Sequence, residues 1–413
     1  MKNVKKVLQV CFTMLAVVAV VGLGKMDAKA AAQVTGLKQT SDSTTSIDVE
    51  WNEMAQGKYA KVYYKLSGTS AWQNPSTTSS NSDHLSSLNP GSSYDIKVEL
   101  YSDYDKQPSQ LVAASGIMEG VTAPGQYTSF AIKQTAAGTS NTTVSWNACP
   151  GANYYKLEYK IASGESRVTY VSGTSTNLTG LKKNSDTYVQ VTPCRKSAQN
   201  YYTKNTSNYK SLRMAVAPSK PKTKYVYIYN KNEANIAIDD NSSNYYAEGF
   251  TCEIYKVSGN KKIKTLKTTS RYPDYKNNAF KKNDLFKVRV KSYATGADGT
   301  KYYSGWSSWS YFSTHNLVKS AKKSGSGIAV KWNKINGASG YKVYASTNRN
   351  KGYKVVATIK KGKTTSATFK KYNKKALKKG KTYYVYVEPF YKSGKKNVDV
   401  VNYWLRYATV KFK

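Results

Sequence analysis

The stretch "GIAVKWN", residues 327–333, alternates apolar side chains with small or charged ones up to a tryptophan. A period of two residues is typical of a strand that buries one face. The pattern occurs twice more, as "SIDVEWN" (46–52) and "TTVSWNA" (142–148). Each copy places a tryptophan on the apolar face: Trp51, Trp146 and Trp332. This repetition predicts a chain of similar β domains.

A second alternating strand follows later in each repeat. Its copies are "SYDIKVEL" (93–100), "DTYVQVTP" (186–193), "LFKVRVKS" (285–292) and "TYYVYVEP" (382–389). The repeats lie about 95 residues apart, and turns rich in Gly, Asn and Ser separate their short strands. Such a pattern predicts an all-β fold of two-sheet antiparallel sandwiches. We predict four domains, at residues 31–124, 125–218, 219–316 and 317–413.

These features resemble fibronectin type III domains, and the resemblance covers residues 31–413 as four tandem copies. The fourth copy, with "GYKVYAST" (340–347), is most similar to versions common on exported proteins of Gram-positive bacteria. The resemblance implies immunoglobulin-like sandwiches with the three tryptophans between the sheets. It also implies that Tyr94 and Tyr383 pack inward and hydrogen-bond the backbone. Two positions depart from it, because Asp240 replaces a tryptophan and Thr187 a tyrosine.

Residues 1–30 have the features of an export signal. Three lysines in the first six residues precede an apolar run from Val7 to Leu23, and Ala28-Lys29-Ala30 is a small-x-small cleavage pattern. A retained membrane anchor is the alternative, although the run is short for a bilayer span. We therefore expect a secreted, extracellular protein associated with the cell wall, with no membrane span after signal removal.

Positive charge is concentrated in the predicted fourth domain. The chain has 64 Lys and Arg against 24 Asp and Glu, and residues 317–413 hold 25 of these cations with two acids, Glu388 and Asp399. Such a field attracts polyanions, and the attraction weakens as salt rises. The densest stretch, residues 359–381, has ten lysines: Lys360, Lys361, Lys363, Lys370, Lys371, Lys374, Lys375, Lys378, Lys379 and Lys381.

We expect this domain to bind an anionic cell-wall polymer or glycan, host matrix polymers included. A solvated lysine face without function is the alternative, although so few acids leave the domain with strong self-repulsion. Nucleic acid is not an expected partner because the chain has an export signal and no nucleic-acid-binding motif.

The stretch "SGWSSWSYF" (304–312) follows the strand "FKVRVK" (286–291), and alternation on that strand turns three cations outward: Lys287, Arg289 and Lys291. Trp306 and Trp309 can lie over these cations and brace the sheet, each contact contributing about 0.5–1 kcal/mol. The W-S-x-W-S signature is similar to that of cytokine receptors, where it also belongs to a fibronectin type III domain. A ligand platform is the alternative role of the two indoles.

The stretch "KYVYIYN" (224–230) puts three tyrosines on one face of a predicted strand: Tyr225, Tyr227 and Tyr229. They can stack against sugar rings or pair with side chains of neighbouring strands. Glycan stacking would make the chain a carbohydrate-binding or adhesive module. A further alternative is an accessory to a separately encoded extracellular enzyme.

Three cysteines remain after export. Cys149 follows Trp146 by three residues and Cys194 follows Val191 by three, at the ends of two strands that run in the same direction in such a sandwich. We therefore predict a Cys149–Cys194 disulfide, with two free thiols as the alternative. Cys252 alternates with apolar residues, which predicts a core position.

Motifs for catalysis are absent from the sequence. The two histidines have no cysteine or carboxylate cluster of metal-ligand spacing nearby, and there is no glycine-rich phosphate loop. We predict no catalytic, metal-binding or cofactor-binding residues and no cofactor. The expected function is that of a non-enzymatic spacer and binding protein at the cell surface.

Overall fold

The computed structural model describes residues 32–52, 59–200, 202–229, 232–240, 246–313, 317–402 and 407–413. The regular structure in these ranges is β-strand, apart from three short 3-10 helices at Pro108–Gln110, Ser258–Asn260 and Asn278–Lys281. Across the described ranges, no helix has the length and apolarity needed to cross a membrane. The predicted export signal, residues 1–30, lies outside the described residues.

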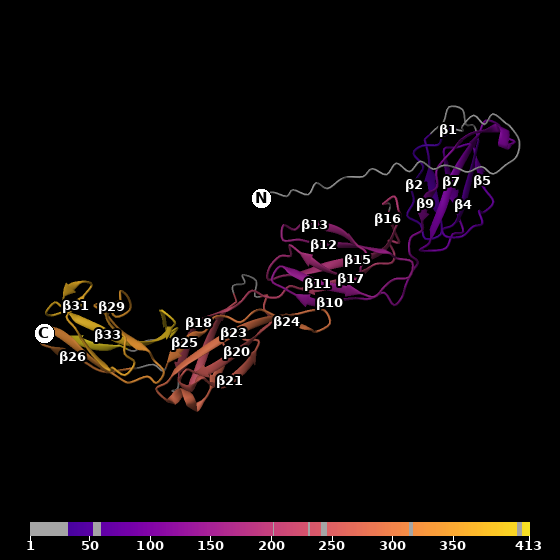
Figure 1. Ribbon diagram of the computed structural model, residues 1–413. Helices are drawn as coiled ribbons and strands as arrows, with labels where there is room; N and C mark the ends of the chain where they lie inside the picture. Colours follow the sequence, from indigo (N-terminus) through magenta and orange to yellow (C-terminus); the bar gives the residue numbers. More distant parts are fainter. Residues whose placement is uncertain are drawn as a thin grey trace, which may run out of the picture. The chain divides into compact units, whose positions relative to one another are not determined.

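The strands belong to two compact units, one with β1 to β8 and the other with every strand from β10 onward (Figure 1). The first unit is one two-sheet sandwich, and the second contains three. In each sandwich a three-stranded sheet packs against a larger one. The pairs are antiparallel except for β1 with β8, so the architecture is all-β, as the alternating sequence predicts.

The smaller sheet of the first sandwich is β2 (Lys38–Gln39), β3 (Ile47–Glu50) and β6 (Ser82–Leu85). Its larger sheet contains β1 (Ala32–Gln33), β4 (Tyr59–Leu66), β5 (Ser76–Thr78), β7 (Ser93–Tyr101), β8 (Leu111–Ala114) and β9 (Met118–Val121). The second sandwich pairs β10 (Ile132–Ala137), β11 (Asn141–Trp146) and β14 (Ser175–Thr179) in its smaller sheet. Its larger sheet contains β12 (Tyr154–Lys160), β13 (Ser166–Val171), β15 (Asp186–Lys196), β16 (Tyr202–Lys204) and β17 (Lys210–Ala215).

The third sandwich pairs β18 (Lys222–Tyr229), β19 (Glu233–Asp239) and β22 (Asp274–Lys276) against β20 (Gly249–Lys256), β21 (Lys261–Thr268), β23 (Leu285–Thr295), β24 (Lys301–Tyr303) and β25 (Ser310–Ser313). The smaller sheet of the fourth is β26 (Val318–Ser324), β27 (Gly327–Trp332) and β30 (Ser366–Phe369). Its larger sheet contains β28 (Gly340–Ser346), β29 (Lys354–Ile359), β33 (Thr382–Ser393), β34 (Lys396–Asp399) and β35 (Ala408–Lys411). A short hairpin of β31 (Lys371–Tyr372) and β32 (Lys375–Ala376) completes it.

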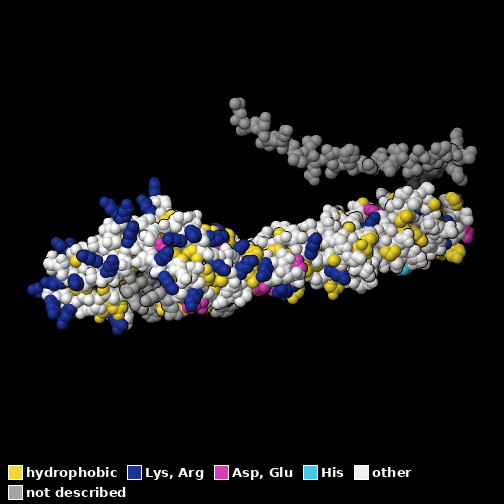
Figure 2. Space-filling model, turned by 90° about the horizontal axis from the view of Figure 1, so that it is seen from below, with side chains coloured by type: hydrophobic (Ala, Val, Ile, Leu, Met, Phe, Trp, Pro, Cys, Tyr) yellow, Lys and Arg dark blue, Asp and Glu magenta, His cyan; other side chains and the backbone are white. Residues whose placement is uncertain are grey.

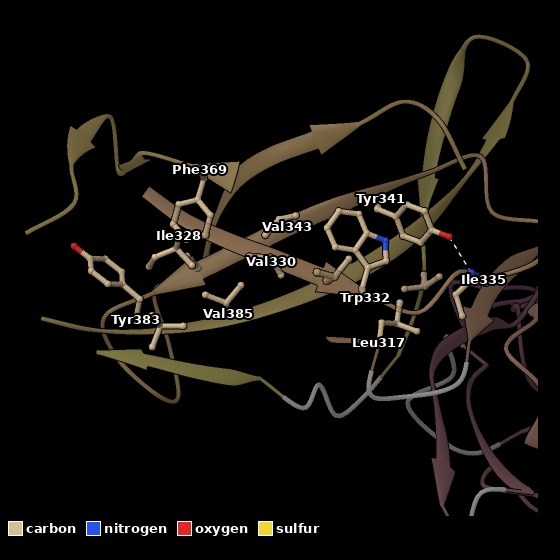
Figure 3. Close-up of a cluster of buried hydrophobic side chains, with 14 of the residues drawn as sticks. Leu317, Ile328, Val330, Trp332, Ile335, Tyr341, Val343, Phe369, Tyr383 and Val385 are labelled. Carbon is tan, nitrogen blue, oxygen red and sulfur yellow. Dashed lines mark hydrogen bonds between the residues drawn. The ribbon is translucent and has the colours of Figure 1, made fainter. Parts of the chain in front are cut away.

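The core of each sandwich is formed by the apolar face of the alternating strands. In the fourth, Ile328, Val330 and Trp332 of β27 point toward Val343 of β28 and Val385 of β33 (Figure 3). Trp51, Trp146 and Trp332 are 4%, 5% and 1% exposed. Because truncating such a buried tryptophan costs about 3–5 kcal/mol, these residues are determinants of folding.

A tyrosine on the third strand closes the turn that follows the buried tryptophan. In the fourth sandwich, the Tyr341 hydroxyl oxygen accepts a hydrogen bond from the Ile335 N–H at 2.9 Å, and its ring centroid lies 5.4 Å from that of Trp332 (Figure 3). In the second, Tyr155 accepts in the same way from the Cys149 N–H at 2.9 Å. Both N–H groups come three residues after the tryptophan, a shared spacing that the sequence analysis missed.

The later strand also carries a buried tyrosine. Tyr94 and Tyr383 are 5% and 2% exposed. The Tyr383 hydroxyl oxygen accepts a hydrogen bond from the Lys378 N–H at 2.9 Å, which ties β33 to the turn before it. The second sandwich has Thr187 in this position, and its neighbour Tyr188 is 63% exposed.

Asp240 takes the place of the tryptophan in the third sandwich and is buried as well. Its side chain forms an ion pair with Arg271, and the Arg271 guanidinium carbon lies 5.8 Å from the centroid of the Phe250 ring. A buried carboxylate needs such a partner because the charge loses its hydration. The departure seen in the sequence is therefore a change from an apolar to an ionic contact.

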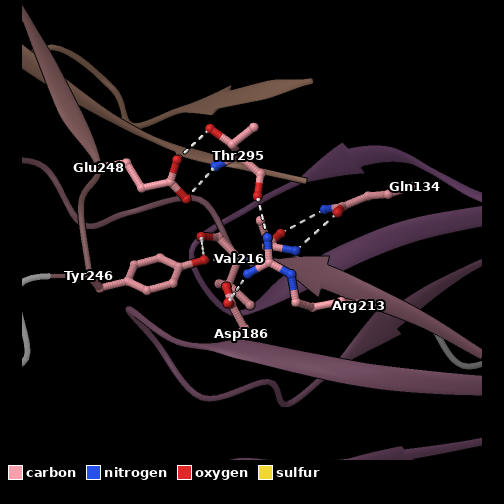
Figure 4. Close-up of polar contacts among 8 residues, drawn as sticks. Gln134, Asp186, Arg213, Val216, Tyr246, Glu248 and Thr295 are labelled. Carbon is pink, nitrogen blue, oxygen red and sulfur yellow. Dashed lines mark hydrogen bonds and ion pairs between the residues drawn. The ribbon is translucent and has the colours of Figure 1, made fainter. Parts of the chain in front are cut away.

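Within the second unit, adjacent sandwiches contact one another. Tyr246 of the third exchanges two hydrogen bonds with the Val216 backbone, at 2.8 and 2.9 Å, close to Asp186 and Arg213 of the second (Figure 4). The contact between the third and fourth combines apolar packing with hydrogen bonds. Leu285 and Tyr311 of the third belong to the hydrophobic cluster of the fourth, and the Leu285 N–H donates to the Asn336 carbonyl at 2.9 Å. The fourth sandwich therefore completes its core only with its neighbour attached.

Candidate polyanion-binding site

The ten lysines between residues 359 and 381 lie in the fourth sandwich, and all are exposed. Three follow β29, and the others surround the β31–β32 hairpin and the turn before β33. Asn373 and Lys374 have φ angles of 49° and 65°, so the hairpin turns tightly and exposes the lysines on either side. Lys and Arg gather over the C-terminal sandwich (Figure 2). None of the ten forms an ion pair with a described residue.

The two acids of this sandwich lie away from those lysines. Glu388 is six residues beyond the start of β33, about 20 Å along the strand. Asp399 ends β34, and its carboxylate forms an ion pair with the Lys342 Nζ at 2.6 Å. This is the one ion pair within the fourth sandwich among the described residues. The acids therefore leave the charge of the lysine-rich end unneutralised.

Glu388 is partly buried beside Tyr344 and opposite Lys342. Burial raises the pKa of its carboxyl to about 7, and the charge of Asp399 adds to the increase. A hydrogen bond from Tyr344 and the charge of Lys342 oppose the shift without cancelling it. Near neutral pH this carboxyl is therefore only partly ionised, and the positive field of the domain is stronger than the formal charges indicate.

Trp306 and Trp309 are half-buried and alternate with the three predicted cations of β23. The Arg289 guanidinium carbon lies 4.5 Å from the Trp306 ring and 4.7 Å from the Trp309 ring, measured to the centroids. The Lys287 Nζ is 4.5 Å from Trp309, and the Lys291 Nζ is 5.1 Å from Trp306. The structure thus brings all five residues into one alternating stack.

Two serines, one before Trp306 and one after it, hold this segment against β23. The Ser307 hydroxyl oxygen accepts a hydrogen bond from the Val290 N–H at 3.0 Å, and the Ser307 N–H donates to the Val290 carbonyl at 2.8 Å. The Ser304 hydroxyl oxygen accepts in the same way from the Ser292 N–H at 3.0 Å. No role for these serines was predicted, although their spacing of three residues around Trp306 is the signal in the sequence.

A similar stack occurs in the first sandwich, which lacks the W-S-x-W-S signature. The Lys97 Nζ lies 4.5 Å from the Tyr63 ring and 5.4 Å from the Trp72 ring. Lys97 also pairs with Glu99 at 2.7 Å. We propose that both stacks brace the outer face of the larger sheet, because the contact recurs where no tryptophan pair is present.

Tyr225, Tyr227 and Tyr229 are half-buried on β18. The Tyr227 and Tyr229 rings stack with their centroids 5.7 Å apart at 22°. Burial, followed by hydrogen bonds to Asp274 and Glu233, raises the pKa of Tyr229 to about 12. The rings therefore pair partly with one another, and their use for glycan stacking stays a prediction.

The predicted disulfide is wrong, because Cys149 and Cys194 are free thiols. Cys149 belongs to the core of the second sandwich. Cys194 lies three residues after the inward-facing Val191, and an odd offset on a strand turns a side chain to the opposite face. Burial raises the pKa of Cys194 to about 11, so its thiol is protonated at neutral pH. Cys252 is a core residue of the third sandwich, the position that its alternation predicts.

The described residues contain no group of three or more His, Cys, Asp or Glu side chains that could hold a metal ion.

The order of strands is the same in all four sandwiches. In the second, third and fourth sandwiches, the first, second and fifth strands form the smaller sheet, and the third, fourth and later strands form the larger one, apart from the separate β31–β32 hairpin. The first sandwich has the same order after its additional first strand, β1, which joins the larger sheet. The four sandwiches have the fibronectin type III fold. The strand order thus confirms the fold that the sequence resemblance implies, and the closer likeness to exported proteins of Gram-positive bacteria stays a prediction.

No family model matches the chain. Two similar solved structures are tandem fibronectin type III segments. One is a two-domain segment from chicken tenascin, with 17% identity, a TM-score of 0.23, and 44% of this chain and 99% of that chain covered. The other is the FN1–FN3 domains of chicken CNTN1, with 13% identity, a TM-score of 0.26, and 69% of this chain and 99% of that chain covered.

Proposed function

We propose that this protein is a non-enzymatic spacer and binding protein of the cell surface, and that its fourth fibronectin type III domain binds anionic wall or matrix polymers. One observation carries the proposal: the ten exposed lysines of residues 359–381 have no ion-pair partner among the described residues. Their mutual repulsion destabilises the folded domain unless a polyanion neutralises it.

The first two domains fit the role of a spacer. Residues 31–218 hold 17 Lys and Arg against 13 Asp and Glu, so the N-terminal half has no comparable field. Contacts between successive domains of the second unit limit their relative motion. The features of residues 1–30 support export, which would place the basic domain where anionic wall polymers or matrix glycans occur.

Sedimentation of the full chain with purified cell walls, or with heparin coupled to beads, tests the proposal. Bound protein should fall steeply between about 50 and 500 mM NaCl, because salt screens contacts between exposed charges. A variant with Gln at the six paired lysines should bind at least tenfold more weakly: Lys370, Lys371, Lys374, Lys375, Lys378 and Lys379. A matched variant with Arg at the same positions keeps the charge and should bind like the parent. No binding, or binding indifferent to salt, would exclude the proposal.

A carbohydrate-binding function through Tyr225, Tyr227 and Tyr229 is the second candidate, supported by their common face and partial exposure. Ring stacking on a neutral sugar depends little on salt, in contrast to the lysine-rich site. Binding of a neutral glycan that is equal at 50 and 500 mM NaCl and is abolished by Tyr227→Ala would favour this candidate. Accessory action beside a separate extracellular enzyme is compatible with either mode of binding.

A further inference from the structure

A pocket of about 400 Å³ lies within the lysine-rich end of the fourth domain. It is lined by Lys323 near the end of β26, by Lys370 and Lys371 at the β31–β32 hairpin, and by Lys379 in the turn before β33. Pockets for small ligands typically measure about 300–1,000 Å³. The volume therefore suits one or two sugar rings and is too small for a folded partner.

The four lysines of the pocket have no competing anion. No carboxylate lines the pocket, and none of the four forms an ion pair with a described residue. The four lysines are exposed, and a concave surface lined by one sign of charge concentrates their field on a bound oxyanion. The pocket is therefore a better oxyanion site than the flat lysine-bearing surface around it.

One wall of the pocket is apolar and fixed. Phe412 is 5% exposed, and its ring meets the Tyr383 ring edge-on with centroids 6.3 Å apart. Its backbone N–H donates to the Lys381 carbonyl at 2.9 Å, and its carbonyl accepts from the Gly380 N–H at 2.7 Å. The Lys323 Nζ lies 5.8 Å from the Phe412 ring centroid, so charge and apolar surface lie side by side.

We propose that this pocket is a discrete site for a sugar residue that carries a sulfate or phosphate ester. The ester oxygens contact Lys370, Lys371 and Lys379, and the apolar face of the ring lies against the half-buried Leu377 and the small exposed part of Phe412. The inference rests on the proposed function and makes it specific: the domain recognises a unit of an anionic glycan at one place, and the surrounding lysines attract the polymer by their field alone.

Titration calorimetry of the full chain tests the site with three defined probes: a sulfated disaccharide from heparin, N-acetylglucosamine 6-phosphate and inorganic sulfate. Either sugar ester should bind with one site per chain and at least tenfold more tightly than inorganic sulfate, which has no ring to place against Phe412. The disaccharide and the sugar phosphate distinguish the two ester types. An oligothymidylate of equal charge should not compete at equal concentration.

Two variants that lose the same number of positive charges distinguish binding in the pocket from attraction by the charge of the whole surface. The pocket variant has Gln at four lining residues, Lys323, Lys370, Lys371 and Lys379. The matched variant has Gln at four exposed lysines outside the pocket: Lys354, Lys360, Lys361 and Lys363. The pocket variant should lose at least tenfold in affinity for the sugar ester, and the matched variant less than threefold.

Equal losses in the two variants would overturn the discrete site and leave the polymer-binding function standing. Tight binding of inorganic sulfate alone, or competition by the oligothymidylate, would overturn the assignment to a sugar ester. If the full chain bound neither long heparin nor cell walls, the proposed function itself would fail.

Discussion

Substitution of Arg289 by Gln tests whether the aromatic and cationic stack on β23 braces the third domain. The guanidinium lies between the two indoles and forms a fork to the Glu253 carboxylate, with Nε and Nη2 at 2.8 and 2.5 Å from one oxygen. Two cation–π contacts are worth about 0.5–1 kcal/mol each. The partly exposed ion pair adds about 1 kcal/mol. The variant should therefore lose about 2–3 kcal/mol of unfolding free energy.

Glu253 makes the substitution informative. Burial alone would raise the pKa of its carboxyl, but hydrogen bonds from Lys262 and Arg289 outweigh burial and hold the pKa below its usual value. Lys262 remains in the variant, at 2.7 Å from the other carboxylate oxygen, so the loss stays moderate. Arg289→Lys retains the cation without the fork and should lose about half as much.

Hydrogen exchange measured by mass spectrometry assigns the loss to a domain. A loss of 2–3 kcal/mol accelerates exchange through global opening by about 30- to 150-fold. Peptides from β20 and β23 should show this increase, and peptides from β12 and β15 of the second domain serve as the internal reference. Unchanged exchange in β20 and β23 would refute bracing. Loss of glycan binding with unchanged exchange would indicate a ligand platform in its place.

Three further predictions concern other contacts. The pKa of Glu388 is raised to about 7 in the folded state against an ordinary 4.5, so the fourth domain should lose stability as pH rises from about 4.5 to 7. Glu388→Gln should flatten that dependence and stabilise the domain by roughly 1–3 kcal/mol at pH 8, as measured by urea denaturation at pH 5 and pH 8; a parallel dependence in parent and variant would contradict the assignment. Tyr383→Phe removes the hydroxyl that accepts from the Lys378 N–H and should cost about 1 kcal/mol, seen as a lower urea midpoint, whereas an unchanged midpoint would show that water replaces it. For the thiols, the intact mass after iodoacetamide in guanidinium should show Cys149 and Cys194 alkylated without prior reduction, and alkylation that requires dithiothreitol would restore the disulfide.

The fold followed from the sequence because each strand carries its burial pattern in its own alternation. Ile328, Val330 and Trp332 point inward for the same reason that they are spaced by two. The same alternation correctly predicted that the three cations of β23 face outward. Contacts of the turns were missed, such as that of Tyr341 with the Ile335 N–H, because they depend on how two strands cross and not on one strand alone.

The disulfide prediction failed by the same rule of parity. The prediction placed Cys149 and Cys194 at strand ends on the same pole of the sandwich. It did not take into account that Cys194, three residues after the inward-facing Val191, lies on the outer face of its strand. The pocket at the lysine-rich end was also outside the reach of the sequence. Lys323 and Phe412 are 89 residues apart in sequence, and only the folded sandwich brings them to the lysines of the β31–β32 hairpin.

The most direct measurement of the central claim is the salt dependence of polymer affinity for two forms of the full chain, the parent and the variant with Gln at the six paired lysines. The parent should show a steep linear fall of log affinity with log salt concentration, and the variant a markedly shallower one, because each ammonium that contacts the polymer contributes to the slope. Equal slopes in the two forms, or a slope near zero in the parent, would contradict the account.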